Sequence, residues 1–147
     1  DLATCCAVTN LVFTLASGAI AFKSKVQPTV STSSIEAELI AVVTAAKLAI
    51  YLRSVLSQLG FAPLAPTPLY EDNMATMAIS NENRPTPRAR HVDIQYFAIQ
   101  EWRQLSHVLL KHISTTINVA NGGTKALGWT VHARHACHAM GHFVPVC

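Results

Sequence analysis

The residues from Ser33 to Gly60 carry the pattern that most restricts how this 147-residue chain can fold. Ser33 is followed by Glu36 three positions later, which is a capping box at a helix N-terminus. Gly60 is a stop signal at the other end. Between them, apolar residues recur at helical spacing at Ile35, Leu39, Val42, Ala46 and Ala49. The spacing predicts a helix from Ser33 or Ser34 to Leu59, with one apolar stripe to bury.

Strand-like segments lie on both sides of this helix. Two runs, Leu11 to Leu15 and Ala19 to Lys25, are separated by Ala16-Ser17-Gly18, and this predicts a β-hairpin with a short Gly-containing loop. The later elements are a buried strand beginning at Leu69, a short helix from Asn73 to Ser80, a long helix from Ala89 to Leu105 and a strand from His107 to Ile113. This order predicts a mixed α/β domain with a single sheet and helices packed on it.

Composition excludes several classes of protein. Half of the residues are apolar and 13% are charged, which is too apolar for a disordered chain. Polar residues interrupt the apolar stretches, so we expect no membrane-spanning segment. The chain begins with Asp1 and shows no leader, which indicates a fragment of a longer protein.

The cysteine positions and the net charge bear on location and partners. The four cysteines have no regular spacing, which favours reduced thiols in the cytosol or nucleus. A net charge of +3 permits a nucleic-acid partner without demanding one.

Two carboxylates are candidate metal ligands. At about 100° per residue, Glu38 falls at the edge of the apolar stripe, whereas Glu36 points away from Ile35 toward a capping role. Asp72 ends the strand that begins at Leu69. A helix carboxylate facing a strand-end carboxylate can hold divalent ions against a phosphodiester. Two alternatives remain open: Glu38 as a boundary residue with a solvated carboxylate, and Asp72 as the N-cap of the next helix.

Four segments occur in an order that resembles a known family. They are Val30 to Leu39 (VSTSSIEAEL), Leu69 to Asn73 (LYEDN), Arg90 to Ile94 (RHVDI), and Ile117 to Asn121 (INVAN) with Thr124 to Leu127 (TKAL). The run GAIAFKSKVQP, residues 18–28, matches the preceding hairpin. Together they closely resemble the ribonuclease H domain of copia-type retrotransposon polyproteins. The resemblance implies a ribonuclease H-like domain over residues 1–127, with its first strand missing or incomplete, and a C-terminal extension over residues 128–147.

The resemblance also implies an activity, which is cleavage of the RNA strand of an RNA–DNA hybrid during reverse transcription. Four carboxylates in this family hold two Mg²⁺ ions. Glu38 and Asp72 match two of them, Asn121 stands where the family has Asp, and the first acid lies upstream of Asp1 or is lost. Because Mg²⁺ binding depends on carboxylate charge, we expect this fragment to be inactive. The competing interpretation is an inactive domain that keeps its fold or weak nucleic-acid binding.

The family context supplies expected partners and a location. A reverse transcriptase domain would precede this one in the same polyprotein, no membrane partner is expected, and the location would be intracellular, including the element's virus-like particle. Several basic residues could contact the phosphates of a hybrid, although a solvated basic surface is the alternative. They are Lys23, Lys25, Arg84, Arg88, Arg90 and Lys125.

Two further signals have ordinary explanations. The tail carries histidines that would fall within an arc of about 120° in a helix, where they could bind Zn²⁺. They are His132, His135, His138 and His142, with Cys137 among them. The alternative is a plain extension. Trp102 lies on the apolar stripe of the second long helix and is expected in the core.

Overall fold

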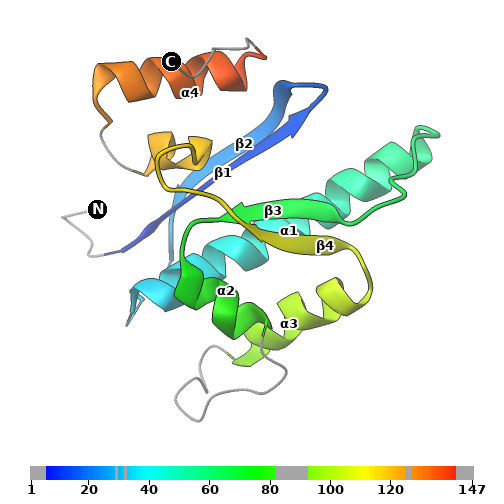
Figure 1. Cartoon of the computed structure of the whole chain (residues 1–147). Helices are drawn as coiled ribbons and strands as arrows, with labels where there is room; N and C mark the ends of the chain where they lie inside the picture. The colour runs from blue at the N-terminus through cyan, green and yellow to red at the C-terminus, as the bar shows by residue number, and fades with distance from the viewer. Residues whose placement is uncertain (1–5, 29, 32, 82–92, 125–126, 142–147) are drawn as a thin grey trace. The chain divides into compact units, whose positions relative to one another are not determined.

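The computed structural model describes residues 6–28, 30–31, 33–81, 93–124 and 127–141. Figure 1 shows the helices and strands that they form. The chain divides into two compact units, one made of Asp1–Ser31 with Ser114–Cys147 and the other of Thr32–Ile113. Each unit contains both strands and helical segments. The predicted α/β class is therefore confirmed, and the predicted domain boundary after residue 127 stays a prediction.

The first unit is built on the predicted hairpin, in which β1 (Val8–Leu15) pairs antiparallel with β2 (Gly18–Val26). The loop consists of Ala16 and Ser17, which have φ values of 49° and 69°. Two consecutive residues with positive φ are what a type I′ hairpin turn requires. Gly18 belongs to β2 rather than to the loop, so the tight turn is made without glycine at its two central positions.

Two short helical elements complete the first unit, η1 (Val119–Gly123) and α4 (Trp129–Ala139). Side chains of the hairpin hydrogen-bond to η1: the Asn10 amide donates to the Ala120 carbonyl, and the Ser24 hydroxyl donates to the Gly123 carbonyl at 3.3 Å. A Cβ on Gly123 would collide with the Asn10 side chain. Glycine is therefore what lets η1 lie this close to β1.

The second unit contains a parallel pair of strands, β3 (Thr67–Glu71) and β4 (Val108–His112), with α1 (Ser34–Gln58), α2 (Met74–Asn81) and α3 (Asp93–Gln104). Strand residues alternate between two faces. Leu69, Glu71, Val108 and Leu110 are buried, together with Leu39, Val42, Val43, Ala46 and Ala49 of α1 and Tyr96 and Ile99 of α3. All three helices contact the strand pair, so one face of the pair forms the core with them.

The expectation of a single sheet is wrong for the described strands, which form two separate two-stranded sheets. A two-residue turn pairs β1 with β2, whereas β3 and β4 become parallel neighbours through a connection that includes α2 and α3. Alternating hydrophobicity predicts where strands occur, but it does not specify which strands pair across a long crossover. The sequence therefore indicated the strands correctly and their assembly into one sheet incorrectly.

Both ends of α1 follow the predicted chemistry. The Ser33 hydroxyl accepts a hydrogen bond of 3.1 Å from the Glu36 backbone N–H, which is the expected N-cap. At the other end Gly60 has a φ of 87°. The Phe61 N–H donates to the Leu56 carbonyl and the Gly60 N–H donates to the Ser57 carbonyl. These two bonds form a Schellman motif, which satisfies carbonyls that the helix leaves open.

By length and composition α1 could also cross a membrane, contrary to the expectation that no segment could. Isolated polar residues do not break an apolar helix, because a helix can satisfy them internally. Thr44, for example, donates its hydroxyl to the Ile40 carbonyl at 2.8 Å. Core helices pass the same test, and α1 buries one side against α2, α3 and the strand pair.

Arg53 ties the Pro-rich connector to α1. Its guanidinium donates to the Ala65 carbonyl at 2.6 Å, to the Pro63 carbonyl at 3.2 Å and to the Thr67 hydroxyl at 3.2 Å. Thr67 is the first residue of β3. The arginine therefore fixes where the strand begins relative to the helix.

We expect Ser33→Ala to lower the free energy of unfolding by about 1 kcal/mol, because the first turn of α1 loses its side-chain cap. Urea unfolding monitored by circular dichroism measures this difference. Ser34→Ala is the matched control, since Ser34 is exposed and already inside the helix. Equal effects of the two substitutions would contradict the assigned cap.

Candidate functional site

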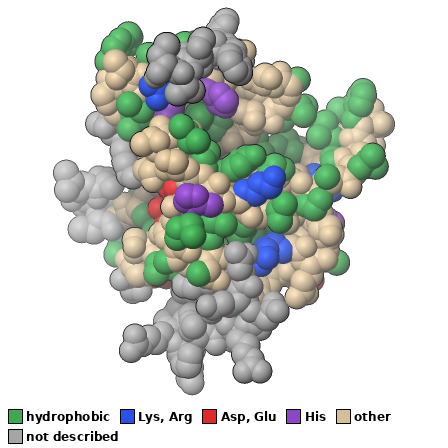
Figure 2. Space-filling view, viewed as in Figure 1, with side chains coloured by type: hydrophobic (Ala, Val, Ile, Leu, Met, Phe, Trp, Pro, Cys, Tyr) green, Lys and Arg blue, Asp and Glu red, His purple; other side chains and the backbone are tan. Residues whose placement is uncertain are grey.

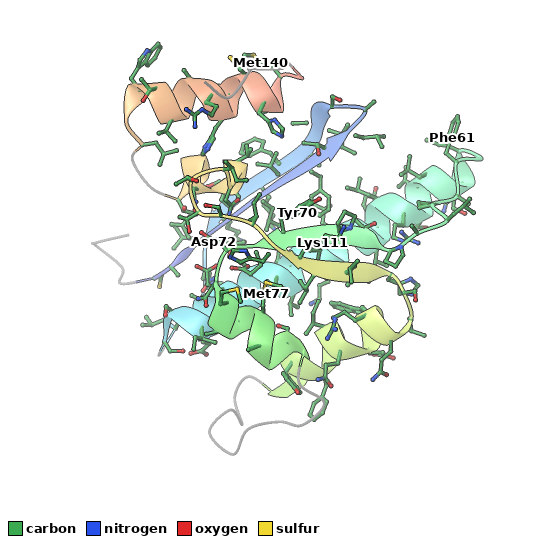
Figure 3. All side chains as sticks on the ribbon, viewed as in Figure 1. Phe61, Tyr70, Asp72, Met77, Lys111 and Met140 are labelled. Atoms are coloured by element: carbon green, nitrogen blue, oxygen red, sulfur yellow. The ribbon has the colours of Figure 1, made fainter. Side chains whose placement is uncertain are left out.

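The carboxyl end of β3 is held by a cap on the following helix. The Asn73 side-chain oxygen accepts hydrogen bonds from the backbone N–H groups of Ala75 (3.0 Å) and Thr76 (3.2 Å). Asn73 is therefore the N-cap of α2. The alternative that Asp72 caps this helix is wrong, because the cap lies one residue later. Asp72 itself is half-buried at the strand end (Figure 3).

Glu71, the last residue of β3, is a site residue that the sequence reasoning missed. It is 7% exposed, and its carboxyl accepts a hydrogen bond of 2.9 Å from the Asn73 N–H. The pKa of Glu71 is raised to about 7, chiefly by burial and also by the negative charges of Glu38 and Asp72, while backbone N–H groups that hydrogen-bond to its carboxylate oppose the rise. Strand alternation offered the signal, since Glu71 must share a face with buried Leu69.

The three carboxylates are electrostatically connected. Glu38 on α1 and Asp72 after β3 both act on Glu71, so a helix acid and a strand-end acid lie around one buried carboxyl group. The metal-binding role of Glu38 and Asp72 stays a prediction, and Glu71 is a third acid beside them that the sequence did not indicate. Glu38 is half-buried, as a boundary residue would be, so the alternative of a boundary residue with a solvated carboxylate stays open.

The donor set fits a hard cation only in part. Carboxylate oxygens are the ligands that Mg²⁺ prefers, and Mg²⁺ in proteins keeps several waters while binding one or two carboxylates. Within the described ranges, no group of three or more His, Cys, Asp or Glu residues could hold a metal ion. Glu38 and Asp72 therefore suit one largely hydrated ion better than a fully ligated pair of ions.

Asn121 lies in η1 of the first unit, whereas Glu38 and Asp72 belong to the second. Its amide nitrogen donates to the Thr115 carbonyl at 2.8 Å, and its backbone N–H donates to the Asn118 carbonyl. These bonds orient the amide and leave its oxygen as the atom that could face a ligand. The role of Asn121 beside the two acids stays a prediction.

The predicted phosphate contacts are described only in part. Lys23 and Lys25 are exposed on β2. The other four, Arg84, Arg88, Arg90 and Lys125, lie outside the described residues. Basic side chains can also be structural, as Arg103 illustrates, because its guanidinium donates to the Ser80 carbonyl near the end of α2.

The tail forms a helix, α4, but its histidines differ in environment. His135 is buried and His132 and His138 are exposed, while His142 lies outside the described residues. Among the described side chains, which include these three histidines, no group of three or more His, Cys, Asp or Glu residues could hold a metal ion. The predicted Zn²⁺ site therefore gains no support from α4.

We expect stability to fall as the pH rises from 4.5 to about 7, because folded Glu71 holds its proton over this range and the unfolded chain does not. The loss should be roughly 2 kcal/mol, from about 1.4 kcal/mol per pKa unit reduced for solvent screening. Denaturant titrations at several pH values test this. Glu71→Gln should flatten the profile over that interval, whereas Glu101→Gln, at an exposed position of α3, should leave it unchanged. A wild-type profile that rises through this range would contradict the buried, protonated carboxyl.

Comparison with known proteins finds a relative among transposon-encoded polyproteins. The chain is 32% identical over 119 residues to a retrovirus-related Pol polyprotein from transposon TNT 1-94 of Nicotiana tabacum. The matched region is 81% of this chain and 9% of the relative. No family model matches the sequence, and no solved structure matches it. The chain is therefore a homologue of one short segment of a transposon-encoded Pol polyprotein.

Proposed function

We propose that this chain is a ribonuclease H-type domain of a copia-type retrotransposon polyprotein, whose ancestral reaction is hydrolysis of the RNA strand of RNA–DNA hybrids. The observation that carries the proposal is the electrostatic grouping of Glu38 and Asp72 around buried Glu71. Acids grouped at the end of a strand and in the first turns of a helix suit metal-assisted phosphodiester hydrolysis. The similarity to a transposon Pol polyprotein supports the same assignment.

Each acid would have its own part in this reaction. Glu38 and Asp72 would bind Mg²⁺, which supplies Lewis-acid stabilisation of the phosphate and a more acidic water. Glu71 lies one residue before Asp72 and bonds to the Asn73 N–H, so it fixes the backbone from which Asp72 projects. Asn73 in turn anchors that backbone to α2.

The proposed site has fewer negative charges than the four-carboxylate site that the family resemblance implies. Two carboxylates neutralise two divalent ions beside a phosphate less well than four, and Asn121 adds an oxygen without charge. We therefore infer a weakly active or inactive domain that still binds its substrate class. In this proposal Lys23 and Lys25 contact hybrid phosphates, together with Arg88, Arg90 and Lys125, and a reverse transcriptase domain precedes this one.

The isolated chain should cleave a labelled RNA–DNA hybrid in Mg²⁺ at or close to the background rate. Asn121→Asp, combined with an N-terminal extension carrying a first-strand Asp, should raise the rate above background, because each added carboxylate neutralises metal charge. Asp72→Asn in that repaired protein should abolish the gain. Robust cutting by the unrepaired chain that survives Asp72→Asn would show that the site is elsewhere.

Divalent-ion binding provides a test that does not depend on turnover. We expect Glu38→Gln or Asp72→Asn to weaken Mn²⁺ binding by at least about ten-fold, measured by paramagnetic relaxation or calorimetry, since Mn²⁺ also prefers carboxylate ligands. Glu36→Gln is the matched control two residues earlier on α1. If Glu36→Gln reduced binding as much as Glu38→Gln, the assignment of Glu38 as the ligand would fail.

A further inference from the structure

The two units of the chain differ in charge. The chain has 11 Lys and Arg residues and 8 Asp and Glu residues. Four of the bases (Lys23, Lys25, Lys125 and Arg134) and one of the acids (Asp1) belong to the first unit, so seven bases and seven acids remain in the second. The first unit therefore carries the whole net charge of +3. This difference follows from the positions of the residues in the chain and does not depend on how the two units are arranged.

The fold of the first unit leaves the charges of its described bases unpaired. Lys23 and Lys25 are exposed on β2, and Arg134 is half-buried on α4. Within the described residues, no ion pair and no side-chain hydrogen bond involves any of the three. The described arginines of the second unit, Arg53 and Arg103, instead donate to carbonyl groups. A partly buried guanidinium without an acceptor is suited to bind an anion from outside the chain.

The helix that carries Arg134 is fixed to the hairpin within the first unit. It contacts both β2 and η1 (Figure 1). Just beyond its end, a Cβ on Gly141 would lie 3.2 Å from the Ser17 carbonyl oxygen in the hairpin loop. Figure 2 shows basic and histidine side chains over this helix. The elements β1, β2, η1 and α4 contain no Asp or Glu, so no carboxylate of these elements opposes a bound anion.

The acids of the second unit create a need for this positive charge. Glu38, Glu71 and Asp72 are grouped there, and carboxylates repel phosphates at close range when no cation neutralises them. A nucleic acid carries one negative charge per phosphate, and it responds to the summed charge of a protein surface. The first unit is the part of the chain with a net charge that can supply the attraction.

We propose that the first unit binds the phosphate backbone of a nucleic-acid duplex by charge, with Arg134 of α4 and Lys23 and Lys25 of β2 as the contacts. The inference rests on the proposed function for the choice of nucleic acid, and it deepens that function by assigning α4, in the C-terminal extension, a role in substrate binding. Binding of this kind needs no metal. Because phosphate contacts carry no sequence information, the affinity should not depend on base sequence.

The test is fluorescence anisotropy of a labelled DNA duplex with the full chain in EDTA, repeated at several salt concentrations. We expect Arg134→Gln to weaken binding several-fold and to reduce the slope of log K against log salt by about 0.9, the value for one phosphate contact. Arg134→Lys keeps the charge and should restore most of the affinity. Lys23→Gln and Lys25→Gln should act like Arg134→Gln, and their exposed positions make loss of folding an unsuitable explanation. Lys47→Gln is the matched control, since Lys47 is exposed on α1 of the second unit.

Losses in the three variants with an unaffected control would support the proposal. Three results would overturn it: an equal loss in Lys47→Gln, a salt slope that none of the three variants changes, or tighter binding to phosphatidylserine vesicles than to the duplex. The result is separable from the proposed reaction, because binding in EDTA does not involve the metal site. If the repaired protein failed to cut while the three variants lost affinity, the proposed reaction would fail and this inference would stand. Cutting by the repaired protein with unchanged affinity in the three variants would overturn this inference alone.

Discussion

Burial of one face of β3 beneath the helices is the constraint on which the rest of the second unit depends. Leu69 is buried in the core. Because alternate residues of a strand face the same side, Glu71 is buried with it and Tyr70 is exposed on the other side. A shift of one residue in register would exchange the two sets, exposing Leu69 and burying Tyr70. Arg53 holds the start of the strand and Asn73 holds its end. The register therefore decides which acid is buried and which side chains reach solvent.

The features of α1 that depend on neighbouring residues could be predicted from the sequence. The Ser33 cap, the Gly60 stop and the apolar stripe between them depend on residues within a few positions of one another, and short-range rules describe them well. The hairpin was predictable for the same reason, although the loop proved to be Ala16-Ser17 with positive φ rather than a glycine turn. What remained beyond sequence reasoning was the pairing of strands, because it depends on contacts between distant segments.

In the candidate site, too, local features were predictable from the sequence and features that depend on the folded backbone were not. Glu38 was placed correctly near the edge of a stripe, and helical geometry was enough for that. The alternative that Asp72 caps α2 stayed open because Asp and Asn are nearly equivalent caps, and only the backbone geometry distinguishes Asp72 from Asn73. Glu71 was passed over because charged residues are rarely buried. Its burial is tolerable because its raised pKa lets it carry a proton near neutral pH.

Grouped acids also explain why a domain of this kind can lose activity and keep its fold. Glu38 and Asp72 repel charge on Glu71, so without a bound cation the group costs stability rather than adding to it. Active sites commonly hold residues that are unfavourable for folding and are retained only because function needs them. Once selection for cleavage is relaxed, replacing an acid by an amide removes repulsion and leaves the helices, caps and strand register intact. Under the proposed function Asn121 would be such a replacement, and its amide donates to the Thr115 carbonyl, which a carboxylate could not do.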